Sequence, residues 1–141
     1  HDGIERIEEW AFNCCYSLRS IKLLGIKFIE TGAFCNCSGL TDIKFGSQLE
    51  RIEGRAFELC FSLSKAIMPS LKIIGEWAFN NCQQLTDLDL PEGLETIEVY
   101  AFYSCLSLGR IAMPLNCIIG ADAFIYCPNL TTVDLVGGVH N

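Results

Sequence analysis

Apolar residues recur along the chain in a fixed sequence motif that is repeated six times. Each copy contains an Ala-Phe pair, a Cys three residues after the Phe, a Leu three residues later, and then two apolar residues separated by one residue. The phenylalanines are Phe12, Phe34, Phe57, Phe79, Phe102 and Phe124. Their spacing alternates between 22 and 23 residues. A period in this range is typical of a solenoid, in which each repeat adds one coil.

Two segments of each copy carry different periodicities. The residues nine and eleven positions after each Phe are apolar in every copy, as at Leu88 and Leu90, which predicts a short strand with one buried face. The Ala-Phe-x-x-Cys-x-x-Leu segment has a spacing of three, which predicts a helical or 3₁₀ turn with one inward face. We therefore expect an α/β repeat solenoid whose short strands are parallel and about 4.8 Å apart.

The repeats continue through the whole chain without a linker or a low-complexity segment. Residues 1–141 are therefore expected to form a single domain. Gly3 and Ile4 match the opening of a repeat, and Gly138 and Val139 match the opening of a seventh. Solenoids cover their end coils with polar caps, and neither end of this sequence shows one. We expect six coils plus the start of a seventh, as part of a longer array.

Charge and hydropathy narrow the class of partner. The net charge is −7 and 50% of the residues are hydrophobic. An acidic chain lacks the basic face that nucleic acids and anionic lipids favour. No apolar run approaches the roughly 18 residues of a membrane span. We therefore expect no nucleic acid as the partner and no membrane insertion by this segment.

The repeated phrase resembles a known family. Leu-x-x-Ile-x-x-x-Ala-Phe-x-x-Cys-x-x-Leu-x-x-Ile-x-Leu-Pro is similar to the BspA-type leucine-rich repeat. The fifth copy matches it at Leu94, Ile97, Ala101, Phe102, Cys105, Leu108, Ile111, Met113 and Pro114. The resemblance implies a right-handed solenoid of short strands and helical or 3₁₀ turns. It also implies a surface, secreted or scaffold protein that acts by binding, and it carries over no catalytic residue because the family's motif has none.

The nine cysteines raise the possibility of disulfides or a metal site. Six of them occupy one inward position per copy, where a buried thiol behaves as a small hydrophobic side chain. Four from the middle copies are expected to be reduced and shielded: Cys37, Cys60, Cys82 and Cys105. Both histidines, His1 and His140, lie at the ends of the chain. We therefore expect no metal site and no cofactor.

The sequence does not favour an enzyme. A hydrolytic triad needs a histidine between its nucleophile and its carboxylate, and the repeats contain no histidine. No glycine-rich loop follows a strand and opens a helix, as phosphate binding would require. We expect a non-catalytic protein.

The first candidate for a partner-binding surface is the outward side of the predicted strands, which we call the strand face. Successive strand residues point to opposite sides, so the residues eight and ten positions after each Phe point outward. The charged residues at these positions are Lys22, Asp42, Lys44, Lys65, Asp87, Asp89, Arg110 and Asp134. Basic residues prevail in the first three copies and acidic ones in the fourth. This pattern is either a solvated face with scattered charges or a bipolar face that fixes the register of a partner.

The second candidate is aromatic and lies on the outer side of the predicted helical turns. It consists of Trp10, Trp77, Tyr100 and Tyr103, and clustered exposed aromatic residues often mark an interface. Two functions stay open: a protein-binding or scaffold module, and a cell-surface adhesin or glycan-binding array. A glycan site needs aromatic rings beside Asp, Asn or Arg, and the region of Trp77 and Tyr100 comes closest. The resemblance favours an extracellular or cell-surface location, with an intracellular scaffold as the alternative.

Overall fold

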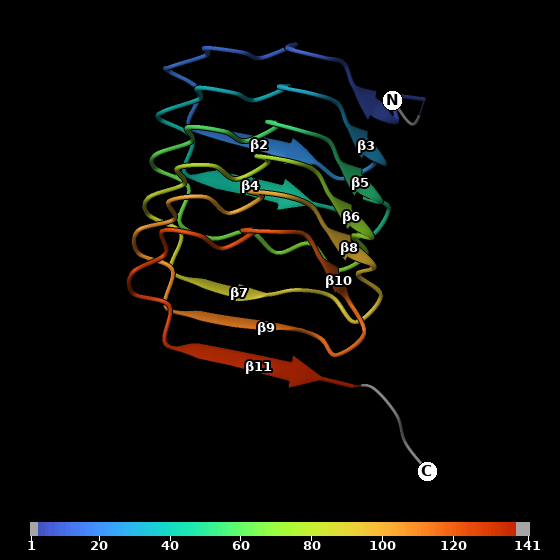
Figure 1. The fold of residues 1–141 in the computed structure, drawn as a ribbon. Helices are drawn as coiled ribbons and strands as arrows, with labels where there is room; N and C mark the ends of the chain where they lie inside the picture. The colour runs from blue at the N-terminus through green and yellow to red at the C-terminus, as the bar shows by residue number, and fades with distance from the viewer. Residues whose placement is uncertain (1–2, 138–141) are drawn as a thin grey trace.

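The computed structural model describes residues 3–137 and forms a stack of six coils (Figure 1). We number the coils one to six after the Phe that each contains. One side of the stack is an uninterrupted parallel sheet of six two-residue strands, which we call the continuous sheet. Its strands are β1 (Arg6–Ile7), β3 (Phe28–Ile29), β5 (Arg51–Ile52), β6 (Ile73–Ile74), β8 (Thr96–Ile97) and β10 (Ile118–Ile119). The sequence patterns above did not predict this sheet.

The strand face is carried by longer parallel strands that are interrupted at coil three. These strands are β2 (Ser20–Leu23), β4 (Asp42–Phe45), β7 (Asp87–Asp89), β9 (Arg110–Pro114) and β11 (Thr132–Val136). β2 pairs with β4, and β7, β9 and β11 form a separate three-stranded sheet. Residues 64–69 take the corresponding place in coil three without forming a strand, as the plain trace between β4 and β7 shows (Figure 1). The predicted solenoid with parallel strands is confirmed, apart from this coil.

The predicted helical or 3₁₀ turn is wrong, because residues 3–137 contain no helix and the fold is a β-solenoid. The Ala-Phe segments form runs of β-turns, with positive φ two residues before and two residues after each Phe, as at Trp77 (60°) and Asn81 (61°). A residue in this left-handed region stops a helix from continuing. The N–H groups then alternate: Ala78 and Asn80 donate to carbonyls three residues earlier, whereas Phe79 and Asn81 donate to coil five.

The phenylalanines form a stacked column through the core. Neighbouring ring centroids lie 5.1–5.4 Å apart and the ring planes differ by only 1–11°. The rings of the four middle coils are fully buried, and so are the isoleucines five residues before them, which line the inner side of the continuous sheet. The inward positions predicted from the repeat are therefore the core of the molecule.

The repeated cysteines form a second column that links neighbouring coils. In coils two to six this thiol donates a hydrogen bond to the Phe carbonyl of the preceding coil; the Sγ–O distance is 3.2 Å from Cys60 to Phe34 and 3.3 Å from Cys82 to Phe57. All nine cysteines are free. Burial raises the pKa of Cys37 to about 11 and raises the pKa of Cys60 and Cys82 further. These thiols therefore act as hydrogen-bond donors between coils as well as filling space.

The predicted start of a seventh repeat, at Gly138 and Val139, lies outside the described residues, as do both histidines. The prediction that the chain is one domain from a longer array stays a prediction.

We expect Phe79→Ala to lower the free energy of unfolding by about 3–5 kcal/mol, the usual range for truncating a buried aromatic side chain. The ring stacks on Phe57 and on Phe102, so its loss weakens two coil interfaces. The matched control is Phe61→Ala, because Phe61 is 38% exposed and should lose much less. Urea unfolding of both variants measures the difference, and equal losses would contradict the central role of the column.

We expect thiol reagents to spare Cys37, Cys60, Cys82 and Cys105 in the native protein at pH 8 and to label them after unfolding. All four side chains are fully buried, and burial raises the thiol pKa, so the reactive thiolate does not form. Exposed Cys14 provides the internal control. Mass spectrometry of timed labelling reads each site, and labelling of Cys82 as fast as Cys14 would show that the column is open.

Candidate functional site: the interrupted strand face

The structure places all eight charged residues of the predicted strand face on the outer side of the coils. Six of them are exposed, and Arg110 and Asp134 are partly exposed. The apolar residues between them, such as Ile43, Leu88 and Ile111, are buried. The alternation of inward and outward positions is therefore as the sequence predicts, although nothing in the structure tests whether these residues bind a partner.

The acidic half of the strand face is organised around one arginine. Arg110 donates from Nη1 to Asp87 Oδ1 (2.9 Å) and to Asp89 Oδ1 (3.0 Å), and from Nε to Asp134 Oδ2 (3.2 Å). The hydrogen bonds to Asp87 and Asp89 raise the pKa of Arg110 above its usual value. One side chain from coil five thus connects coils four, five and six. The acidity predicted for the fourth copy is therefore partly neutralised by the fifth, which the repeat pattern alone did not reveal.

The basic half of the strand face has no such balance. Lys22 and Lys44 are direct partners in the parallel ladder of β2 and β4, and like charges at opposed positions destabilise a sheet. Among the described residues, no carboxylate forms an ion pair with Lys22, Lys44 or Lys65. Within residues 3–137, the three lysines of coils one to three therefore carry charge that no ion pair neutralises.

The interruption at coil three leaves main-chain groups unpaired on this face. In the regular coils the N–H of Asp42 donates to Arg19 of the preceding coil, and that of Thr132 donates to Gly109, each at 3.2 Å. No main-chain hydrogen bond joins residues 64–68 to β4 or β7 within the described part of the chain. Both strand edges that border coil three are therefore free.

Two side chains of unusual size border the interruption. Phe45 is larger than the Leu or Met found at its position in the other copies, and its ring meets Phe57 of coil three edge-on, with centroids 6.1 Å apart. Ala66 stands where the other copies carry Ile, Leu or Val. Ala66 and Met68 are still buried, so coil three keeps its inward residues and loses only the ladder. Phe45 and Ala66 are the departures from the repeat pattern that the sequence shows next to the break.

Two depressions flank the unpaired segment. The larger, of about 440 Å³, lies between Lys65, Ala66 and Ile67 on one side and Thr86, Asp87 and Asp89 on the other. The smaller, of about 190 Å³, lies between residues 43–45 and the pair Ile67 and Pro69. Ile67 separates the two and is 72% exposed. An apolar side chain is thus exposed in the middle of a face that is otherwise mostly charged.

The second candidate surface is a group of aromatic rings that pack on one another. Trp77 stacks on Tyr100 with centroids 4.5 Å apart, and Tyr103 contacts both rings at 5.2 and 5.8 Å. Tyr126, which the sequence analysis did not include, joins Tyr103 at 5.3 Å. The guanidinium of Arg55 lies 5.5 Å from the centre of the Trp77 ring. Much of the ring surface is therefore already covered by neighbouring coils.

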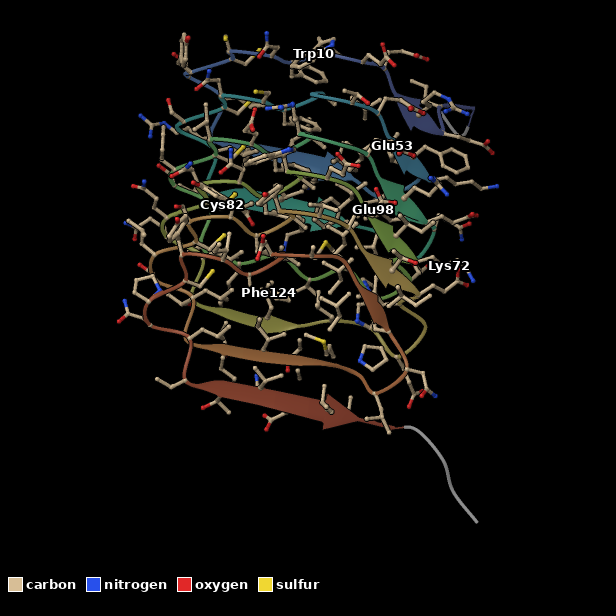
Figure 2. All side chains as sticks on the ribbon, in the orientation of Figure 1. Trp10, Glu53, Lys72, Cys82, Glu98 and Phe124 are labelled. Carbon is tan, nitrogen blue, oxygen red and sulfur yellow. The ribbon has the colours of Figure 1, made fainter. Side chains whose placement is uncertain are left out.

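Trp10 does not belong to this aromatic group. It lies in coil one (Figure 2) and makes no ring contact with the others among the described residues. Its ring packs over Gly32, where an added Cβ would come within 2.2 Å of the indole. The structure thus brings together three of the four predicted aromatic residues and separates the fourth.

Within residues 3–137 no group of three or more His, Cys, Asp or Glu side chains could hold a metal ion. In the same residues no helix is long and apolar enough to cross a membrane.

Comparison with known proteins identifies the repeat. The family described as BspA type leucine rich repeat region matches residues 5–131 in six copies. Similar solved structures are a leucine rich repeat protein of T. pallidum (28% identity, TM-score 0.88), a leucine-rich repeat protein of Bacteroides ovatus (28%, 0.76) and a leucine rich cell surface protein of Faecalibacterium prausnitzii (33%, 0.66). They cover 96%, 94% and 96% of this chain, which spans only 66%, 40% and 31% of theirs. A search of curated proteins found no match.

We expect Arg110→Ala and Lys44→Ala to shift the melting temperature in different directions at low ionic strength. Loss of Arg110 leaves three carboxylates of neighbouring coils without their shared cation, so the melting temperature should fall. Loss of Lys44 relieves its repulsion with Lys22, so the melting temperature should stay the same or rise.

Thermal unfolding followed by circular dichroism measures both shifts. In about 1 M salt, which screens exposed charges, the two variants should approach the wild type. An Arg110→Ala protein that melts like the wild type at low salt would show that the three ion pairs do not hold the coils together.

Proposed function

The chain belongs to the family of BspA-type leucine-rich repeats, and from this premise we propose that it is a non-catalytic module that binds another protein through its strand face. The observation that carries the proposal is the uncompensated positive charge of Lys22, Lys44 and Lys65 next to the acidic group held by Arg110. We assign the partner-binding role to the eight charged residues of the strand face, in a protein without a cofactor.

Complementary charge on the partner is the simplest reason for this arrangement. A partner carboxylate beside Lys22 and Lys44 would turn their mutual repulsion into attraction, whereas a basic group would be favoured near Asp87 and Asp89. Such bipolar complementarity speeds association and fixes the register more than it raises affinity. The stack of coils is a regular scaffold for this purpose, because the continuous sheet on the opposite side is unbroken.

The location that fits this proposal is extracellular or at the cell surface. The support is that one structural relative, from Faecalibacterium prausnitzii, is described as a cell surface protein. An intracellular scaffold is the alternative.

The competing function is an adhesin or glycan-binding array that uses the aromatic side of the coils. It has weaker support, since a sugar stacks on a free ring face, and Trp77 shares its surface with Tyr100 and Arg55. Tyr126 is 61% exposed and is the member of the group best placed to meet a ligand.

We expect the double variant Lys44→Glu, Lys65→Glu to slow association with the partner several-fold at 0.15 M salt and to reduce the salt dependence of the rate. The control is Lys72→Glu, an equally exposed lysine beside the continuous sheet (Figure 2). The partner is recovered by pull-down and mass spectrometry, and surface plasmon resonance gives the rates. Unchanged association of the double variant, together with lost binding of Tyr126→Ser, would move the interface to the aromatic side.

A further inference from the structure

We propose that the gap at coil three is a docking slot for an extended segment of the partner protein, which binds by adding a strand to the free edge of β7. This inference rests on the proposed function and makes it more specific. It names the part of the strand face that is used, the structure that the partner brings, and the main-chain groups that hold it.

The hydrogen-bond pattern of the regular coils shows which groups of β7 face the gap. Where a coil pairs with the preceding one on this face, the residue eight positions after its Phe donates its N–H to that coil, as Asp42 does to Arg19. The residue ten positions after each Phe turns its carbonyl the same way, since Ala112 accepts from Leu90 of the preceding coil at 2.8 Å. By this register the N–H of Asp87 and the C=O of Asp89 point toward coil three.

Neither of these two groups has a main-chain partner within residues 3–137. A row of unpaired N–H and C=O groups on a strand edge is a template for pairing with another chain. In strand addition, main-chain hydrogen bonds supply affinity while pockets for alternate side chains supply specificity. The edge of β7 provides the main-chain hydrogen-bonding groups, and the slot beside it provides a pocket for side chains.

The slot has the size and lining that a strand's side chains require. Its volume of about 440 Å³ lies within the range of about 300–1,000 Å³ that is usual for ligand pockets. Ile67 forms part of the wall opposite β7 and is 72% exposed, whereas the equivalent residues of other coils are Lys, Asp or Ala. This isoleucine offers an apolar contact to the outward side chain that would lie beside it on an incoming strand.

The segment that forms the opposite wall is held by buried side chains and not by a main-chain ladder. Residues 64–68 make no main-chain hydrogen bond to either neighbouring strand in the described chain. They are held by the burial of Ala66 and Met68 beneath them. An outward shift of this segment would widen the slot without breaking a main-chain ladder, at the cost of part of the burial of Ala66 and Met68.

The charged residues that line the slot favour particular residue types in the incoming segment. The slot is lined by one cation, Lys65, and by two carboxylates, Asp87 and Asp89. The occupant that fits is an extended protein segment with apolar side chains at alternate positions and a Lys or Arg among the outward ones. A folded surface that touches only the side chains of the strand face would need none of the unpaired main-chain groups.

The test compares Asp87→Pro with Asp87→Ala. Both variants lose the carboxylate, but only proline removes the N–H that faces coil three. That N–H has no main-chain partner within residues 3–137, and proline is tolerated on strand edges whose N–H is not used in a ladder. Both variants should therefore fold, with melting temperatures within a few degrees of one another.

The probe is a displayed library of eight-residue segments randomised at every second position and selected on the wild-type protein. Selected segments should bind Asp87→Pro about tenfold more weakly than Asp87→Ala, the effect of one lost hydrogen bond of ordinary strength. Hydrogen exchange at the amide of Asp87 should slow when the segment is bound.

A second measurement does not depend on how the proline variant folds. N-methylation of a selected segment on the edge that meets β7 should weaken binding to the same degree, whereas N-methylation on its other edge should not. Failure to select any binding segment overturns the inference, and so do segments that bind both variants and both N-methylated forms equally.

The outcome is separable from that of the proposed function. If Lys44→Glu, Lys65→Glu slows the natural partner while Asp87→Pro binds that partner as Asp87→Ala does, the strand face binds it without strand addition. The proposed function then stands and this inference fails.

Discussion

The structure depends on main-chain hydrogen bonds that run from each Phe segment to the next coil. The N–H of Phe79 donates to Ala101 and that of Phe57 donates to Ala78, each at 2.8 Å. These bonds bring successive rings into stacking contact and place each cysteine within reach of the carbonyl of the preceding Phe. They are possible only because the segment is not a helix, which would use the same N–H groups internally. Positive φ at residues such as Trp77 costs about 1 kcal/mol or more each, and the bonds between coils offset that cost.

The coils pair regularly on one side of the molecule, whereas on the strand face the pairing is interrupted. The Phe segments and the continuous sheet are in register in all six coils. The strand face is the side where a coil can lose its ladder, because Ala66 and Met68 stay buried and keep coil three in the stack. A partner surface can therefore vary on the strand face, through its charges and through the break, without loss of the column that holds the coils together. This is the usual division between a scaffold and the positions that carry its function.

The two candidate surfaces differ in what they leave unsatisfied. Rings of the aromatic group cover one another, so the group is largely an internal contact between coils. The strand face keeps opposed lysines at Lys22 and Lys44, an exposed Ile67, and free strand edges at coil three. Each of these is a cost in the isolated chain that contact with another molecule would remove. Arg110 shows that the same face can also neutralise part of its own charge.

The sequence by itself determined the number of coils, their parallel stacking, and which residues point inward, because one period of 22 or 23 residues fixes the same environment in every copy. It also placed the charged residues of the strand face on one side, through the two-residue period of a strand. Tertiary structure decided the rest. A spacing of three fits a helix and a run of β-turns equally, and only bonds to the neighbouring coil select the turns. Likewise, the break at coil three lies beside a contact of Phe45 with Phe57 across a coil boundary. Arg110 forms hydrogen bonds with three aspartates that are all more than 20 positions away from it in the sequence. The ring contacts that join Tyr126 to Trp77 through Tyr103 also span more than 20 positions each. A repeat pattern records what the copies share, whereas these contacts depend on how one copy differs from the next.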